Sequence, residues 1–184
     1  EQSEFADFHV SLALPRNLRR WFKPQVLFLF DGYSPFKPLP LAQAFPMLEW
    51  GLNWCVSKHA NRYLIIHAAV VEKGGWAVIM PAPPGSGKST LCAALISRGW
   101  RLLSDELALI RVGDGEIVPF PRPVSLKNES IDIIRHYEPG AIFSRKVVDT
   151  VKGAVAHMKV PADSIFRATE VVQKTRVIFP KYQT

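Results

Sequence analysis

The sequence predicts an α/β fold, a mixed sheet with flanking helices, preceded by a small α+β segment at the N-terminus. Through the middle of the chain, short apolar runs alternate with segments of helical periodicity, which is typical of α/β proteins. A glycine-rich loop at residues 81–88 also joins a predicted strand to a predicted helix. We expect the strands and helix of residues 1–62 to pack on a core formed by residues 63–184. Because the sequence stops just after an apolar run, we also expect this core to continue beyond the last residue.

Composition and charge exclude several classes of protein. With 48% hydrophobic and 21% charged residues, the chain of 184 residues is too apolar for a disordered protein. Its net charge of +7 favours an anionic partner, such as a nucleotide or a phosphorylated substrate. Cys55 and Cys92 have no metal-binding spacing, and we expect both to be buried and reduced in a cytoplasmic protein. No apolar stretch is long enough to cross a bilayer, so we expect no membrane partner.

Two strands and a helix are predicted before residue 62. Residues 8–14 alternate between apolar and polar side chains, and residues 25–30 form an apolar run that ends at the turn signal Asp31-Gly32. Between residues 41 and 60 the apolar residues recur at helical spacing, and Pro46 falls in the first turn, where it is tolerated. The densest basic cluster lies between the two strands, and we interpret it as a solvated face, with a nucleic-acid patch as the alternative: Arg16, Arg19, Arg20 and Lys23.

The core is predicted to begin with two strands and a helix. Tyr63–Val71 is rich in β-branched residues, and after the turn at Gly74-Gly75 the apolar run 76–80 predicts a buried strand. Residues 88–98 predict a helix that Gly99 ends as a C-cap. Later elements follow in chain order: strands at 101–103 and 107–111, a hairpin turn at 112–115, a Pro-rich extended segment at 117–127, a short helix at 130–136 capped by Ser130 or Asn128, and a final strand at 176–179.

Residues 82–89 read Ala-Pro-Pro-Gly-Ser-Gly-Lys-Ser and match the phosphate-binding pattern G-x-x-x-x-G-K-[ST], with Ala82 in place of the first glycine. Backbone N–H groups of such a loop bind phosphates, aided by the positive end of the following helix. Lys88 is then expected to reach the outer phosphates and the Ser89 hydroxyl to bind Mg²⁺. The alternative is a Gly/Pro loop with an incidental lysine. The predicted nucleotide-binding residues are Gly85, Ser86, Gly87, Lys88, Ser89 and Thr90.

Asp105 and Glu106 follow the next predicted strand. In proteins with such a loop, a carboxylate at a neighbouring strand end holds Mg²⁺ or accepts a proton from the attacking hydroxyl. Adjacent acids alternate faces, so only one of them need enter the site, and the alternative is a solvated turn. His67 lies on the strand before the loop, where an isolated histidine is more often a core residue than a functional one.

Three stretches of the chain resemble the catalytic core of HPr kinase/phosphorylase, and the spacings between them also agree. They are His67-Ala-Ala-Val-Val, Pro-Gly-Ser-Gly-Lys-Ser at residues 84–89, and the run from Arg98 to Glu106. The chain is more similar still to the HprK-related kinase A group, which are bacterial relatives of that enzyme. This closer likeness spans nearly the whole chain and is clearest at residues 45–55, 102–110 and 149–159.

The resemblance implies a P-loop kinase core of the PEP-carboxykinase-like type. Such an enzyme uses ATP and Mg²⁺ to transfer the γ-phosphoryl group to a hydroxyl acceptor, either a protein serine or a small molecule. The resemblance makes Asp105 the catalytic base, places His67 and Lys88 in the active site, and assigns Mg²⁺ to Ser89, Asp105 and Glu106. Because HPr kinases assemble as hexamers, it also implies a homo-oligomer.

Two other functions stay open on the residues alone. The family's Ala-Asp-Asp has become Ser104-Asp105-Glu106 here, which favours a nucleotide-binding regulatory module without efficient phosphoryl transfer. The positive net charge would also suit a nucleic-acid-binding NTPase, but no segment interleaves aromatic and basic residues, so we do not expect nucleic acid as a partner. Several basic or glycine residues are candidates to cover the γ-phosphate, in the segment 145–159 or before it: Lys152, Gly153 and His157, with Arg122 and Lys127 as rivals.

Overall fold

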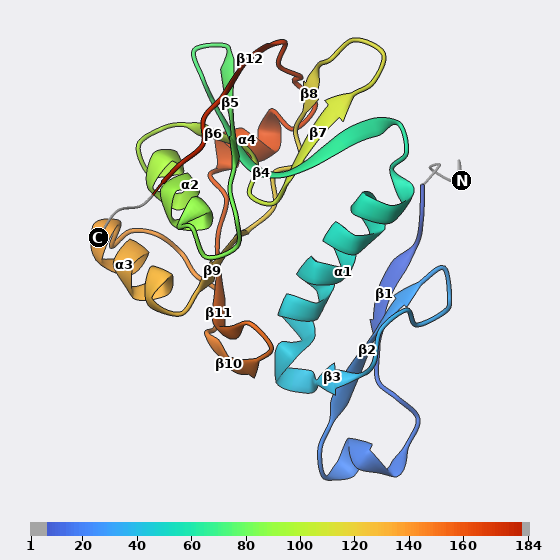
Figure 1. Cartoon of the computed structure of the whole chain (residues 1–184). Helices are drawn as coiled ribbons and strands as arrows, with labels where there is room; N and C mark the ends of the chain where they lie inside the picture. The colour runs from blue at the N-terminus through green and yellow to red at the C-terminus, as the bar shows by residue number, and fades with distance from the viewer. Residues whose placement is uncertain (1–6, 182–184) are drawn as a thin grey trace. The chain divides into compact units, whose positions relative to one another are not determined.

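The computed structural model describes residues 7–181, which form a mixed α/β fold with more strands than helices (Figure 1). This confirms the predicted fold class at the level of α/β. The chain divides into two compact units, the first ending at Ala60 and the second beginning at Asn61.

The first unit is a three-stranded antiparallel sheet followed by one long helix. Strand β2 is central, with β1 on one side and the two-residue β3 on the other. The predicted strands and helix are confirmed, whereas β3 and two short 3-10 helices had no counterpart in the prediction. In chain order the elements are β1 (Val10–Ala13), η1 (Leu18–Trp21), β2 (Gln25–Phe30), β3 (Leu39–Pro40), η2 (Leu41–Gln43) and α1 (Ala44–His59).

The core of the first unit forms where β2 packs against α1. Alternate side chains of β2 are buried, as expected for a strand with one covered face, and Phe28 among them is completely buried. Gly51 of α1 lies against the Phe28 ring, so closely that a Cβ atom at this position would overlap the ring. A glycine in the middle of a helix costs about 1 kcal/mol relative to alanine, and here it makes room for the aromatic ring.

The second unit is built on a six-stranded sheet whose central strand is β4 (Tyr63–Lys73). Strand β5 pairs with one edge of β4, and the parallel strand β12 pairs with β5. The other edge of β4 is shared by two strands, β7 along its first half and β6 along its second. Sheet order is β12-β5-β4-β7-β8, and the bounds are β5 (Trp76–Pro81), β6 (Arg101–Ser104), β7 (Leu107–Arg111), β8 (Ile117–Val118) and β12 (Lys174–Val177).

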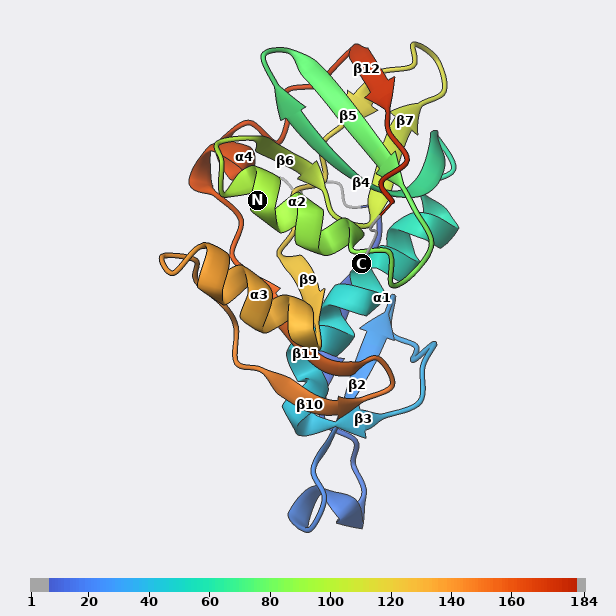
Figure 2. The same ribbon diagram turned by 60° about the vertical axis from the view of Figure 1, so that its left-hand side comes forward.

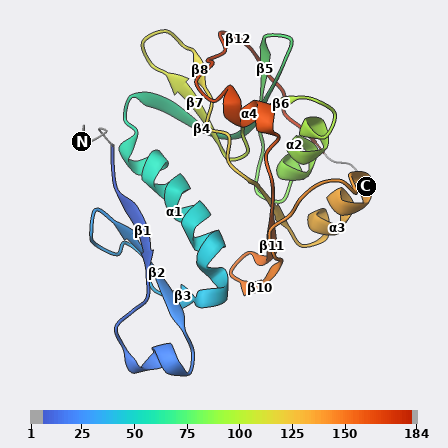
Figure 3. The same cartoon turned by 180° about the vertical axis from the view of Figure 1, so that it is seen from behind.

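Three helices and a second small sheet complete this unit. Helices α2 and α3 lie side by side (Figure 2), and α4 lies next to β6 (Figure 3). The small antiparallel sheet has the order β10-β11-β9. The bounds are α2 (Lys88–Ile96), β9 (Val124–Lys127), α3 (Glu129–Tyr137), β10 (Val147–Thr150), β11 (Gly153–Met158) and α4 (Ala162–Phe166).

Most of the predicted elements of the second unit are present, with small differences at their ends. Gly99 follows α2 in the left-handed conformation, with a φ of 77°, as predicted for a C-cap. The predicted side-chain cap of α3 is wrong, because Asn128 makes no capping hydrogen bond and the Ser130 hydroxyl donates to the Lys127 carbonyl instead. The last strand begins at Lys174, two residues before the predicted start.

Two apolar clusters hold the six-stranded sheet in place, one on each face. Because successive side chains of β4 point to opposite faces, Ala69 and Val71 join one cluster, while Ala68 and Val70 join the other. The first cluster contains the buried side of α2, including Cys92 and Ile96. Packing in this first cluster therefore fixes the position of α2 relative to β4.

Gly51 offers a test of how closely the first unit is packed. We expect Gly51→Ala to lower the free energy of unfolding by about 1–2 kcal/mol, because overpacking the Phe28 ring outweighs the gain in helix propensity. Denaturant unfolding measures the change. Gly113→Ala is the matched control, since a Cβ atom there meets nothing within 4 Å. A Gly51→Ala variant as stable as the parent would show that the helix and the ring separate easily.

Candidate active site

The glycine-rich loop leaves β5 and enters α2, so the predicted strand–loop–helix context is present. Gly85 and Gly87 have φ angles of 85° and 78°, a region that favours glycine over residues with a Cβ atom. The Ser86 N–H donates to the Pro83 carbonyl at 3.3 Å, which closes a tight turn before the helix. Gly87 is the N-cap of α2 and has no side chain to accept a hydrogen bond. The N–H groups of the first helical turn therefore face the loop without a side-chain acceptor.

The edge of β4 brings the acidic pair to the same place as the loop. Where β7 gives way to β6, the Ala68 N–H donates to the Glu106 carbonyl at 3.1 Å. On the other edge of β4, Ala68 lies opposite Pro81, the last residue of β5 before the loop. The loop and the acidic pair therefore meet at one point of the sheet, although they are separated in the sequence.

Lys88 and His67 form the first contact within the site. Lys88 is only 7% exposed, and its Nζ lies 3.3 Å from the Nε2 of His67. A lysine ammonium group can only donate, so Nε2 accepts and the proton of the neutral ring sits on Nδ1. Partial desolvation and the Lys88 charge lower the pKa of His67, which agrees with a neutral ring. Because much of the His67 side chain is still exposed, it is not a core histidine.

Asp105 is buried, with only 5% of its surface exposed. Its Oδ2 accepts a hydrogen bond from the Ser125 N–H at 3.0 Å, and the Ser89 side chain also donates to this carboxylate. Burial and the neighbouring charge of Glu106 raise the pKa of Asp105 to about 6. The other oxygen, Oδ1, is buried and has no hydrogen-bond partner, which is costly unless a further group binds there.

The loop, His67 and Glu106 line a cavity of about 340 Å³, and Asp105 does not. Glu106 is partly exposed, so of the two acids it is the one that faces the cavity. The complete lining is His67, Pro83, Pro84, Gly85, Gly87, Lys88, Ser89, Thr90, Glu106, Ser125, Lys127 and Lys152. All the predicted nucleotide-binding residues except Ser86 are among them.

Two further lysines reach this cavity from the small sheet. Lys127 ends β9, and Lys152 lies in the turn between β10 and β11. The Thr150 hydroxyl shapes that turn, because it accepts from the Lys152 N–H at 3.0 Å and donates to the Gly153 carbonyl at 2.6 Å. Desolvation and the nearby charge of Lys127 lower the pKa of Lys152, while Glu106 opposes the shift. With Lys88, these lysines make the cavity suited to a polyanion.

The remaining candidates for covering a phosphate do not line the cavity. His157 lies in β11 with 2% exposure, and burial, together with the charge of Arg122, lowers its pKa to about 4. It is therefore a neutral core residue at neutral pH. Arg122 and Gly153 are also absent from the lining. Gly153, with a φ of 80°, instead forms part of the turn between β10 and β11. Sequence reasoning missed Ser125, because nothing in its local sequence marks a backbone donor for Asp105.

The residues present fit a Mg²⁺ ion that is bound together with a nucleotide. Among residues 7–181, no cluster of three or more His, Cys, Asp or Glu side chains could hold a metal by itself. Mg²⁺ usually needs no such cluster, because it binds through one or two carboxylates, substrate phosphates and water. The Ser89 hydroxyl beside Asp105, with the unpartnered Oδ1 of that carboxylate, supplies the oxygen donors such an ion prefers.

A family model described as SynChlorMet cassette protein ScmC matches residues 45–138, just over half of the chain. The matched part contains the glycine-rich loop, the acidic pair and Lys127, whereas Lys152 lies beyond it. No curated protein and no solved structure matches the chain. Within the described residues, no helix has the length and apolar character needed to cross a membrane.

The raised pKa of Asp105 predicts how stability depends on pH. Because the folded chain binds this proton more tightly than the unfolded chain, the stabilising contribution is complete below about pH 4 and is lost as the pH rises through about 6. Relative to Asp105→Asn, which cannot ionise, the parent should lose about 2–3 kcal/mol between pH 4 and pH 7. Denaturant unfolding across this range measures the difference, and parallel pH curves for the two proteins would contradict it.

Proposed function

This chain belongs to the family of SynChlorMet cassette protein ScmC, and we propose that it is an ATP- and Mg²⁺-dependent kinase with a P-loop core. The observation that carries the proposal is the convergence of the glycine-rich loop, Lys88 and Glu106 on one cavity, next to the buried Asp105 carboxylate, which has a pKa of about 6 and is hydrogen-bonded to Ser125 of the lining. The resemblance to HPr kinase/phosphorylase and to the HprK-related kinase A group supports the same function. It also supports a PEP-carboxykinase-like arrangement of the core.

The loop and the start of α2 would bind the phosphates of ATP. Between Gly85 and Thr90, the backbone N–H groups other than that of Ser86 would donate to the phosphates, and no acidic residue lies in this segment. Lys88 would leave His67 for the β- and γ-phosphates, since a phosphate oxygen is a stronger acceptor for an ammonium group than a neutral imidazole. Bound Mg²⁺ would neutralise phosphate charge, and we expect Ser89, Asp105 and Glu106 to hold it.

Asp105 would then act as the general base. The Asp105 carboxylate would accept the proton of the acceptor hydroxyl as the hydroxyl oxygen bonds to the γ-phosphorus, and the bond from that phosphorus to the β-phosphate oxygen would break to release ADP. A pKa of about 6 suits this role, because the carboxylate is ionised at neutral pH yet basic enough to take the proton. Lys127 and Lys152, which reach the cavity from the small sheet, would neutralise charge on the group in transfer.

One observation favours a second function, a nucleotide-binding regulatory module without efficient transfer. Asp105 is buried and does not line the cavity, whereas a general base must come within hydrogen-bond reach of the acceptor. In that case the carboxylate only positions Ser89 and a bound ion. The two functions differ in whether the γ-phosphoryl group leaves ATP for an acceptor.

Labelled ATP separates the two functions. The intact chain is incubated with γ-labelled ATP, Mg²⁺ and a lysate of the host, and the label is separated into protein, small-molecule and free-phosphate fractions. We expect label in a protein or small-molecule fraction, and Asp105→Asn should reduce that label by about 10²- to 10⁴-fold while leaving ATP binding nearly unchanged. Glu106→Gln, run in parallel, reports whether the acid that lines the cavity is the base instead. Saturable ATP binding without any transfer would favour the regulatory module.

Lys88→Ala tests the phosphate-binding role of the loop lysine. Loss of a charge-assisted hydrogen bond should weaken ATP binding by about 10- to 100-fold, because such a bond contributes about 1.5–3 kcal/mol. Isothermal titration with ATP and Mg²⁺ measures the affinity. His67→Ala is the informative companion, since it removes the partner of Lys88 in the empty site but none of the phosphate contacts. Unchanged ATP affinity in Lys88→Ala would place the nucleotide elsewhere.

Lys152→Ala tests whether the β10–β11 turn acts on the transfer step. We expect the rate of transfer to fall by about 10-fold or more, with a smaller change in ATP affinity, because the charge on the phosphoryl group is redistributed in the transition state. Lys159→Ala is the matched control, an exposed lysine after β11 that does not line the cavity. Equal effects of the two variants would mean that only the overall positive charge matters.

A further inference from the structure

The connection between β1 and β2 carries large apolar side chains in solvent. Leu18, Trp21 and Phe22 are 83%, 71% and 85% exposed, and together they form the tip of the first unit, residues 18–22. In Figures 1 and 2 this connection extends past the end of the β1–β2 ladder, beyond β3. Neighbouring exposed apolar side chains of this size are characteristic of an interaction site.

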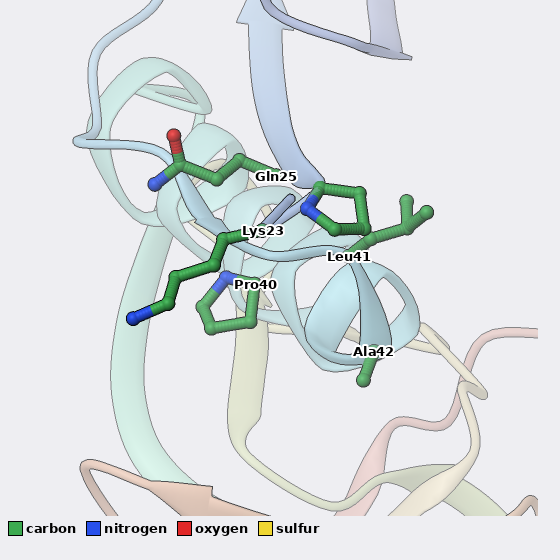
Figure 4. A pocket seen from close by; sticks show the side chains of 6 residues that line it. Lys23, Gln25, Pro40, Leu41 and Ala42 are labelled. Carbon is green, nitrogen blue, oxygen red and sulfur yellow. The ribbon is translucent and has the colours of Figure 1, made fainter. Parts of the chain in front are cut away.

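The residues that follow the tip in the sequence line a groove. It has a volume of about 420 Å³ and is lined by Lys23, Pro24, Gln25, Pro40, Leu41 and Ala42. The Leu41 N–H donates to the Pro24 carbonyl at 2.9 Å, which ties its two lining segments together. Figure 4 shows Lys23 and Gln25 extending to one side, with Leu41 and Ala42 on the other. The groove is therefore mainly apolar, with polar groups along one side.

The charge around the tip and the groove is almost entirely positive. Between His9 and Glu49 the sequence has one acidic residue, Asp31. The same stretch has five basic residues, four of them within or beside the β1–β2 connection: Arg16, Arg19, Arg20, Lys23 and Lys37. No acidic residue lines the groove within the described chain. A ligand of complementary charge is acidic.

We propose that the tip and the groove together bind a segment of a partner protein that carries both bulky apolar and acidic side chains. An apolar side chain of the segment fills the groove, others cover Trp21 and Phe22, and its carboxylates face Lys23, which lines the groove. A lipid surface would cover the tip but leave the groove unfilled, and a nucleic acid would place phosphates against apolar walls. The proposal does not depend on the proposed kinase activity.

Fluorescein-labelled synthetic peptides of about 12 residues test this with the intact chain. One pool combines Asp and Glu with Leu, Phe and Trp, a second replaces the acidic residues with Lys, and a third replaces the apolar residues with Ser. Fluorescence anisotropy should show saturable binding of the first pool alone, and added salt should weaken it. Phe22→Ser and Leu41→Asp should each weaken binding by about 10-fold or more, as expected for residues at the centre of an interface. Lys23→Gln should have a smaller effect.

The controls separate this surface from general stickiness. Phe166→Ser removes a phenylalanine with the same 85% exposure in α4, and Lys58→Gln removes an exposed lysine at the end of α1. Neither should change peptide binding, and all variants should keep the thermal stability of the parent because the substituted residues are exposed. Absence of peptide binding would overturn the proposal. So would equal losses in the controls, or preferential binding to phosphatidylserine vesicles or to single-stranded RNA.

Discussion

The candidate site depends on the way β4 changes partner along one edge. Two strands, β7 and β6, divide that edge, and the chain between them is short enough to contain only Asp105 and Glu106. The Ala68 N–H, which neither strand pairs at this point, is satisfied by the Glu106 carbonyl. Leaving this buried donor without a partner would be costly, so the acidic pair is held where the strands change over. The opposite edge of β4 delivers the glycine-rich loop to the same place.

A buried ion-pair network anchors the strand that leads into this turn. Arg101 begins β6 and is 4% exposed, and its Nε lies 3.0 Å from a carboxylate oxygen of Glu72 on β4. Its other nitrogens donate to the Arg167 and Glu170 backbone carbonyls, after α4. Buried ion pairs of this kind add little net stability, but removing one partner leaves the charge of the other buried and uncompensated. The network therefore fixes the position of β6, and with it Asp105, more than it stabilises the fold.

The site itself contains unfavourable electrostatics that a ligand would relieve. Asp105 is buried next to Glu106, with one oxygen unpartnered. Burial and, to a smaller extent, the charge of Lys127 lower the pKa of Lys88, while the charges of Asp105 and Glu106 oppose this shift. Arrangements of this kind cluster at functional sites, because their unfavourable free energy is recovered when a ligand of suitable charge binds. A polyanion with a divalent cation would satisfy both groups of side chains at once.

The sequence by itself determined the local features of this protein. Glycines at the left-handed positions 85 and 87, the lysine that follows them, and the apolar strand and helix on either side are set by neighbours in the chain, so they were predictable. Only the tertiary structure decided that the Ser125 N–H holds Asp105, and that Lys127 and Lys152 reach one cavity. These contacts depend on β9 pairing with β11, strands far apart in the sequence. Neither β10 nor β11 was predicted, because the chain after residue 139 lacks a clear hydrophobic period and its strands are stabilised by the pairing itself.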